Sequence, residues 1–187
     1  HKMHRIHAYP AKFPAFITTK AIQYSEKLGI ELNHIADIFC GCGTTSYEAR
    51  RNSIDFWGCD INPVATLIAE VKSKNYKDET LTKYFESIID KFNSLDYSDF
   101  DFSSVNERIR YWFNDDKIID LTRLIDSIEY VIPTRSHYKK FFLCAFSNIL
   151  KKSSKWLSKS IKPQIDPDKK PRDVITLFTE QFKFMRE

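Results

Sequence analysis

The residues with the clearest capacity for chemistry form one short stretch, in which a predicted strand runs through two glycines into a predicted helix. The stretch reads Asp37-Ile38-Phe39-Cys40-Gly41-Cys42-Gly43-Thr44-Thr45. Glycine has no Cβ, so the backbone can turn sharply there and a ligand can approach it closely. The N-terminus of a helix also offers unpaired N–H groups to an anion. The stretch therefore predicts a binding loop for a ligand with a small negative group.

An acidic residue, Asp60, follows the second predicted strand. In a doubly wound sheet Asp60 lies beside the glycine loop, where a carboxylate can accept hydrogen bonds from both hydroxyls of a ribose. The loop lacks the third glycine of the dinucleotide fingerprint and the Gly-Lys-Ser/Thr of a P-loop, which disfavours a pyrophosphate. The pattern favours a nucleoside with a small charged arm, such as S-adenosylmethionine, with its carboxylate at Thr44 and Thr45. A tight turn that binds no ligand is the alternative.

The elements that must position this loop are short, and they lie in the first 75 residues. Strands are predicted over 34–39 and 54–59, and helices over 14–28, over 44–52 and from Asn62-Pro63 onward. The rest of the chain keeps helical spacing over 81–95, 118–128 and 141–150, and a further helix is expected over 172–186. We therefore expect an α/β unit over residues 1–75 and a mainly helical segment over residues 76–187.

The composition excludes several classes of protein. With 42% hydrophobic and 29% charged residues among 187, the chain can form a core and is neither disordered, collagen-like nor a disulfide-stapled miniprotein. No apolar run approaches the roughly 20 residues of a membrane span, and the first six residues predict no signal peptide, so we expect no membrane partner. Four cysteines predict free thiols in a reducing, cytoplasmic compartment. Their spacing fits no zinc finger, so we expect no metal.

The net charge of +4 is unevenly distributed along the chain. Residues 61–134 carry 9 basic and 14 acidic side chains, whereas residues 135–187 carry 13 basic and 5 acidic ones. The densest basic stretch, which we expect to bind nucleic acid, contains Lys151, Lys152, Lys155, Trp156, Lys159 and Lys162. Clustered lysines can follow a phosphate backbone, and an aromatic ring among them can stack on a base. A solvated helix end is the alternative.

The motifs resemble those of DNA methyltransferases that modify exocyclic amino groups, adenine N6 or cytosine N4. The cofactor motif of that family reads Asp-Pro-Phe-x-Gly-x-Gly-Thr-Thr, and this chain departs from it only at Ile38. The segment from Gly58 to Pro63 is similar to the family's Gly-x-Asp-x-x-Pro. The segment from His7 to Pro14 is similar to its helix-opening motif beside the methionine end of the cofactor. Residues 110–113, Arg-Tyr-Trp-Phe, also look like part of a helical insert in some of these enzymes.

This resemblance implies a Rossmann-like class I methyltransferase fold, with an incomplete sheet here, that binds S-adenosylmethionine and acts on double-stranded DNA. It implies that Phe39 packs near the cofactor, that Asp60 binds the ribose and that Lys12 lies near the carboxylate. The residues that it assigns to the cofactor are Tyr9, Ala11, Lys12, Phe13, Asp37, Phe39, Cys40, Gly41, Gly43, Thr44, Thr45, Asp60 and Ile61.

The catalytic motif of that family, Asp/Asn/Ser-Pro-Pro-aromatic, is absent, because the chain contains no Pro-Pro pair. In the family this motif holds the target amine and stacks on the flipped base. We therefore assign no catalytic residue and expect the cofactor-binding half of an enzyme, inactive alone. A longer chain or a second polypeptide would supply the other half, and excess apolar surface would favour that partner or a homodimer. An RNA methyltransferase fragment and a non-catalytic nucleic-acid-binding subunit are the alternatives, although the segment from His7 to Pro14 favours DNA.

Overall fold

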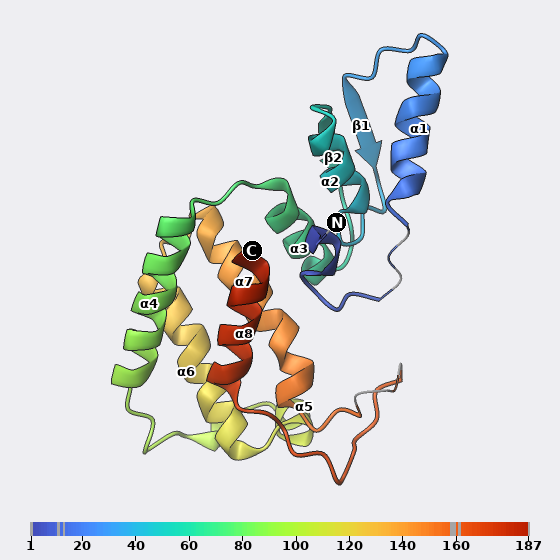
Figure 1. Cartoon of the computed structure of the whole chain (residues 1–187). Helices are drawn as coiled ribbons and strands as arrows, with labels where there is room; N and C mark the ends of the chain where they lie inside the picture. The colour runs from blue at the N-terminus through green and yellow to red at the C-terminus, as the bar shows by residue number, and fades with distance from the viewer. Residues whose placement is uncertain (1, 11, 13, 158–159, 161, 187) are drawn as a thin grey trace. The chain divides into compact units, whose positions relative to one another are not determined.

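The computed structural model describes residues 2–10, 12, 14–157, 160 and 162–186. The chain divides into two compact units, His1–Asn75 and Tyr76–Glu187. The first unit combines two strands with three helices, and the second consists of helices and loops (Figure 1). The expectation of an α/β chain that is mostly helical is therefore confirmed.

The α/β unit is built around two parallel strands, β1 (His34–Asp37) and β2 (Asp55–Gly58), with His34 paired to Asp55 and Asp37 to Gly58. In the described residues these two strands form the whole sheet. The helices of the unit are α1 (Phe16–Lys27), α2 (Thr44–Arg51) and α3 (Pro63–Ser73), and the short 3-10 helix η1 (Lys2–Arg5) precedes them. Both strands and α1 are shorter than the sequence pattern predicts.

One face of this sheet is covered and the other is open to solvent. Ile35 and Phe56 point to the covered face, where they pack against Ile22 of α1, Ala49 of α2 and Ile54. The alternate strand residues are exposed on the opposite face: His34, Ala36, Asp55 and Trp57. Parallel sheets normally have both faces covered, so this sheet is incomplete within the described residues.

Local chemistry explains where the elements of the first unit begin and end. The side chain of Asn62 caps α3 by accepting a hydrogen bond from the Val64 N–H at 3.0 Å, and Pro63 occupies the first helical position. Gly29 follows the end of α1 and has a left-handed φ of 72°. This turn allows the Ile30 N–H to donate a hydrogen bond to Ser25 O in the last turn of the helix. The start of α3 agrees with the prediction from the sequence, whereas α1 ends at Lys27, one residue before its predicted end.

The helical unit contains a bundle of long helices (Figure 1). Its core includes buried aromatic side chains. Its elements are α4 (Asp78–Ser94), η2 (Phe102–Ser104), α5 (Glu107–Trp112), α6 (Asp115–Val131), α7 (His137–Ser153) and α8 (Val174–Arg186). The rings of Phe85 and Phe182 stack with centroids 4.1 Å apart, and Phe142 stacks on Phe182 at 5.8 Å. The start of α8 differs from the prediction: the helix begins at Val174, where Asp173 accepts a hydrogen bond from the Thr176 N–H at 2.7 Å.

Two general expectations can be compared with the structure. None of the described helices combines the length and the apolar character that crossing a bilayer requires. All four cysteines are free thiols, and Cys40, Cys42 and Cys144 are buried.

Candidate functional site

The glycine loop joins the end of β1 to the start of α2 and relies on left-handed backbone at both glycines. Gly41 has φ 48° and Gly43 has φ 73°, conformations that side chains with a Cβ rarely adopt. A Cβ at Gly43 would lie 2.6 Å from the Cα of Ala69 on α3, so only glycine allows the loop to approach that helix. At Gly41 the nearest atom would be 4.0 Å away, and this side of the loop is open.

Asp37 fixes the shape of the loop from its first residue. One oxygen of its carboxylate accepts a hydrogen bond from the Thr45 hydroxyl at 2.9 Å, and the other accepts from the Phe39 N–H at 3.1 Å. Thr44 and Thr45 are both buried at the start of α2. The structure therefore gives Asp37 and Thr45 a role in holding the loop, in addition to the cofactor contact predicted for them.

Asp60 lies beside the glycine loop, at the end of the neighbouring strand. Its Oδ2 accepts a hydrogen bond from the Gly41 N–H at 2.9 Å, and its Oδ1 accepts one from the Asn62 N–H at 2.8 Å. These bonds orient the carboxylate, and each oxygen keeps a second acceptor position. Asp60 is only partly buried, so its free lone pairs can accept hydrogen bonds from a ligand hydroxyl.

Two apolar side chains that follow the strand ends project into solvent. Phe39 is 83% exposed and Ile61 is 100% exposed. Each follows a strand end, Phe39 after β1 and Ile61 after β2. The start of α2 follows the same loop, and no side chain caps its first N–H groups. Apolar flanks, an acceptor and a helix N-terminus are the features that an adenosine with a charged arm requires.

The segment that precedes α1 folds back on itself through Lys12. Its ammonium donates to His7 O at 2.6 Å and to His4 O at 2.9 Å. The ammonium of Lys12, predicted to lie near the carboxylate of the cofactor, is therefore bound by backbone carbonyl groups. The hydroxyl of Tyr9 accepts a 3.5 Å hydrogen bond from the Asn62 amide, which links this segment to the cap of α3. Ala11 and Phe13, the other two residues predicted here, lie outside the described residues.

A buried lysine that the sequence motifs did not predict contacts the loop. Lys72 of α3 is 1% exposed, and its ammonium donates to Cys42 O at 2.6 Å. A signal for it exists, because Lys72 continues the spacing of Ala65 and Ile68, which form the buried stripe of α3. A charged residue in an apolar stripe indicates a specific buried partner, which here is a carbonyl of the glycine loop.

Burial also perturbs the titratable groups around the loop. Desolvation, followed by the nearby charges of Lys12 and Lys72, lowers the pKa of His7 to about 4. Burial, and then the carboxylates of Asp37 and Asp60, raise the pKa of the Cys40 thiol. Cys40 therefore remains a neutral thiol near pH 7, and it serves the loop as a small buried side chain and not as a nucleophile.

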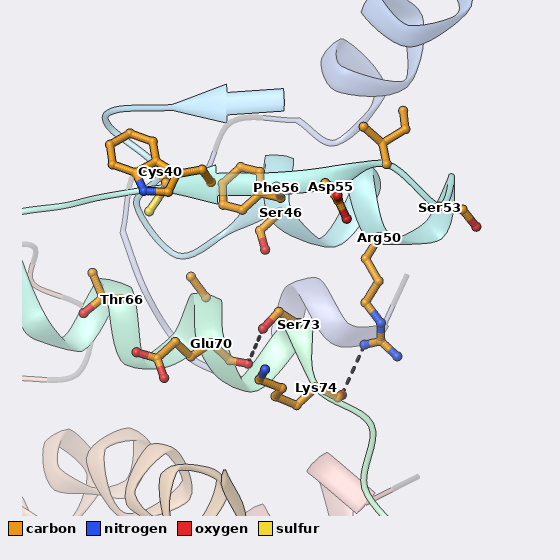
Figure 2. Close-up of a pocket in the computed structure, with 14 residues that line it drawn as sticks. Cys40, Ser46, Arg50, Ser53, Asp55, Phe56, Thr66, Glu70, Ser73 and Lys74 are labelled. Atoms are coloured by element: carbon orange, nitrogen blue, oxygen red, sulfur yellow. Dashed lines mark hydrogen bonds between the residues drawn. The ribbon is translucent and has the colours of Figure 1, made fainter. Parts of the chain in front are cut away.

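A cavity of about 710 Å³ adjoins the loop at Cys40 and Gly58 (Figure 2). It lies between β2, α2 and α3 and is lined mainly by polar side chains, with Phe56 and Trp57 as its aromatic residues. The guanidinium of Arg50 spans its end by donating to Lys72 O at 3.0 Å and to Lys74 O at 3.1 Å, which satisfies carbonyls at the C-terminus of α3. The cavity therefore runs alongside β2.

The basic stretch of the helical unit is more structured than its sequence indicates. The ring of Trp156 stacks on Trp112 with centroids 5.3 Å apart, and the Lys151 ammonium lies 5.0 Å from the centroid of the Trp156 ring. Lys155 donates through its ammonium to Arg110 O at 3.4 Å. Lys152 and Lys162 are exposed, whereas Lys159 lies outside the described residues.

Comparison with known proteins identifies relatives of this chain. It is 25% identical over 154 residues to the type II methyltransferase M.MvaI of Kocuria varians, an alignment that covers 79% of this chain and 34% of that protein. It is also 25% identical over 186 residues to the type II methyltransferase M.MjaII of Methanocaldococcus jannaschii, covering 99% of this chain and 28% of that protein.

The chain spans about a third of the length of these curated relatives. No family model matches the chain, and no solved structure matches it. The similarity to two type II methyltransferases confirms the methyltransferase resemblance that the sequence motifs predict.

Proposed function

We propose that this chain is the S-adenosylmethionine-binding portion of a site-specific DNA methyltransferase that acts on adenine N6 or cytosine N4. The observation that carries the proposal is the position of Asp60, whose carboxylate is held by the Gly41 N–H at the mouth of the loop. The similarity to type II methyltransferases supports it. The parallel strands joined through α2 are consistent with a Rossmann-like methyltransferase fold.

The residues present fit the proposed cofactor. Asp60 would accept hydrogen bonds from the ribose hydroxyls, and the exposed side chains of Phe39 and Ile61 would flank the adenosine. The uncapped N-terminus of α2 would meet the carboxylate of the methionine arm. When bound, S-adenosylmethionine supplies an electrophilic methyl group for transfer to an amine. The chain's own residues hold the loop in place through the Asp37–Thr45 contact and the Lys72–Cys42 contact.

The free surfaces of the sheet support the expectation that the catalytic motif comes from further polypeptide. The N–H groups of Asp55 and Cys59 donate toward β1, to Asn33 O and Asp37 O. Because successive residues of a strand direct their backbone groups to alternate sides, Phe56 and Gly58 direct theirs to the outer edge, which lines the cavity. A further strand of a larger sheet would fit along this edge, and further helices would cover Trp57, which is 61% exposed.

The experiment that tests the cofactor assignment is titration of S-adenosylmethionine into the chain by calorimetry, with Asp60→Ala, Asp60→Asn and Asp55→Ala beside it. Asp55 is a matched control because it is an exposed acid at the other end of β2. We expect Asp60→Ala to weaken binding by about 1–3 kcal/mol, the scale of a lost hydrogen bond to a charged group. Asp60→Asn keeps one acceptor oxygen and should weaken it less.

The expected pattern also requires that Asp55→Ala binds S-adenosylmethionine as the unaltered chain does. Equal affinities of the Asp60→Ala and Asp55→Ala variants, with both folded by circular dichroism, would contradict the assignment of Asp60 to the ribose. Efficient methylation of DNA by the 187 residues alone would contradict the proposal that the catalytic motif lies elsewhere.

A further inference from the structure

An exposed helical turn in the second unit carries both positive charge and apolar surface. The residues Glu107–Tyr111 of α5 are all exposed, and they include Arg108, Arg110 and, at 57% exposure, Tyr111. Within the described residues, neither guanidinium forms a side-chain hydrogen bond or an ion pair, in contrast to Arg172, which binds Glu180. The charges of Arg108 and Arg110 are therefore available to an external anion.

The basic stretch at the end of α7 lies against this turn. The Lys155 N–H donates to Trp112 O at 2.8 Å, and the Lys155 ammonium donates to Arg110 O at 3.4 Å. The rings of Trp112 and Trp156 stack, with an angle of 28° between their planes. These contacts join residues 107–112 and 151–156, which are distant in sequence, into one surface.

The side chains of this surface differ in whether they are held by other residues or face solvent. Trp156 is covered by Trp112 and has Lys151 over its ring, so it acts as a support and does not present a free face for stacking. Lys155 is engaged with a backbone carbonyl. Arg108, Arg110, Lys152 and the ring of Tyr111 face solvent, as do Ile109 and the acidic Glu107. Lys151 is also exposed, but its ammonium lies over the Trp156 ring.

We infer that this surface, residues 107–112 with 151–156, binds the phosphate backbone of duplex DNA, through Arg108, Arg110 and Lys152, with Tyr111 as its exposed aromatic contact. Its two segments hold five basic side chains and one acidic one. Residues 107–112 belong to the part of the chain with net negative charge, 61–134, and residues 151–156 belong to the part with net positive charge, 135–187. A surplus of positive charge favours phosphate over an apolar protein partner, and arginine and tyrosine side chains are common phosphate contacts. The inference rests on the proposed function and assigns it a DNA-binding surface.

Fluorescence anisotropy of a labelled duplex, titrated with the full chain over a series of salt concentrations, tests this inference. The Arg108→Ala/Arg110→Ala variant should bind about tenfold more weakly near 0.1 M salt. The slope of log affinity against log salt should fall by about 2, because two phosphate contacts are lost. Tyr111→Ala should lower the affinity about fivefold without changing that slope, since it removes no charge.

The matched control is Lys83→Ala/Arg135→Ala, which removes two exposed charges from other places in the same unit. Arg135 precedes α7, whereas Lys152 lies in its last turn. The control should leave the salt slope unchanged. An equal loss of affinity and slope in both double variants would overturn the inference. Self-association that depends on Arg108 and Arg110, without DNA binding, would also overturn it and assign the surface to protein contact.

Calorimetry with S-adenosylmethionine on the same preparations separates this inference from the proposed function. If Asp60 governs cofactor binding but the α5 variants bind duplex DNA normally, only the DNA-binding surface is wrong. If the chain binds duplex DNA through α5 but Asp60 has no effect on the cofactor, the surface stands and the cofactor assignment fails.

Discussion

In the helical unit a cluster of phenylalanine rings packs together in the core, whereas in the α/β unit several large aromatic side chains face solvent. Phe142 and Phe178 are fully buried among stacked rings. Phe39 and Trp57, by contrast, are 83% and 61% exposed. The helical unit therefore completes its own hydrophobic core, and the α/β unit leaves apolar surface at the strand ends and on one face of its sheet.

This difference identifies the apolar surface that the α/β unit leaves uncovered. Large exposed apolar groups mark binding sites or interfaces in soluble proteins. In the α/β unit, Phe39 and Ile61 follow the strand ends, where a cofactor is proposed, and Trp57 lies on the open face of the sheet, where further polypeptide is proposed.

Phe142→Ala should destabilise the helical unit by about 3–5 kcal/mol, because the ring is fully buried against Phe178 and Phe182 and its loss leaves a cavity. Hydrogen exchange measured by mass spectrometry would report the loss of protection in peptides from residues 76–187. Tyr130→Ala is the control, since Tyr130 is 75% exposed on α6, and it should cost less than about 1 kcal/mol. Equal loss of protection in residues 1–75 would show that the units unfold together.

The helices of this unit could be predicted because their apolar residues repeat at helical spacing over long stretches. The pattern failed for α5, which spans six residues and begins after an Asn106 cap. Its position depends on the stacking of Trp112 on Trp156, two residues far apart in the sequence. The sequence predicted that Trp156 stacks on a base. No local pattern could show that the ring of Trp112 covers it, because the two residues are far apart in the sequence.

Gly43→Ala should cost about 2–4 kcal/mol and lower the affinity for S-adenosylmethionine at least tenfold. It combines a left-handed φ of 73° with a Cβ only 2.6 Å from Ala69 Cα, so α2 and α3 must separate. Gly29→Ala is the matched control, because Gly29 has φ 72° but open space around its Cβ position. It should cost about 1 kcal/mol and leave cofactor binding unchanged. Calorimetry and urea unfolding measure both effects, and similar costs for the two variants would exclude a role for the close approach to Ala69.

The candidate site was predictable to the extent that it depends on chain order. Two glycines between a strand and a helix, with an acid after the next strand, predicted the loop and the neighbouring position of Asp60. The sequence did not reveal that Lys12 folds back onto His4 and His7 or that Lys72 lies under the loop. Both contacts join a charged side chain to backbone carbonyls, and carbonyl positions follow from tertiary packing and not from residue type.

The smallest expected effect is a loss of stability of the α/β unit at acid pH. The pKa of His7 is about 4 in the folded chain, against an ordinary value near 6.5. Between these values the unfolded chain binds more protons, so the contribution of His7 is complete above pH 6.5 and is lost as the pH falls toward 4. Since the imidazole is not wholly shielded from solvent, we expect about 2 kcal/mol over this range.

Urea unfolding between pH 7 and pH 4.5 measures this loss, with the fluorescence of Trp57 as the signal. The chain used for this measurement carries Trp112→Phe and Trp156→Phe, so that Trp57 is its single tryptophan. His7→Gln should flatten the pH dependence, because glutamine does not titrate. Burial also lowers the pKa of His4, despite its contact with Glu48, so part of the slope should remain. His34→Gln is the control, since His34 is exposed on the open face of the sheet. If His34→Gln reduces the dependence of stability on pH as much as His7→Gln does, the buried segment around Lys12 is not the source of the acid sensitivity of the α/β unit.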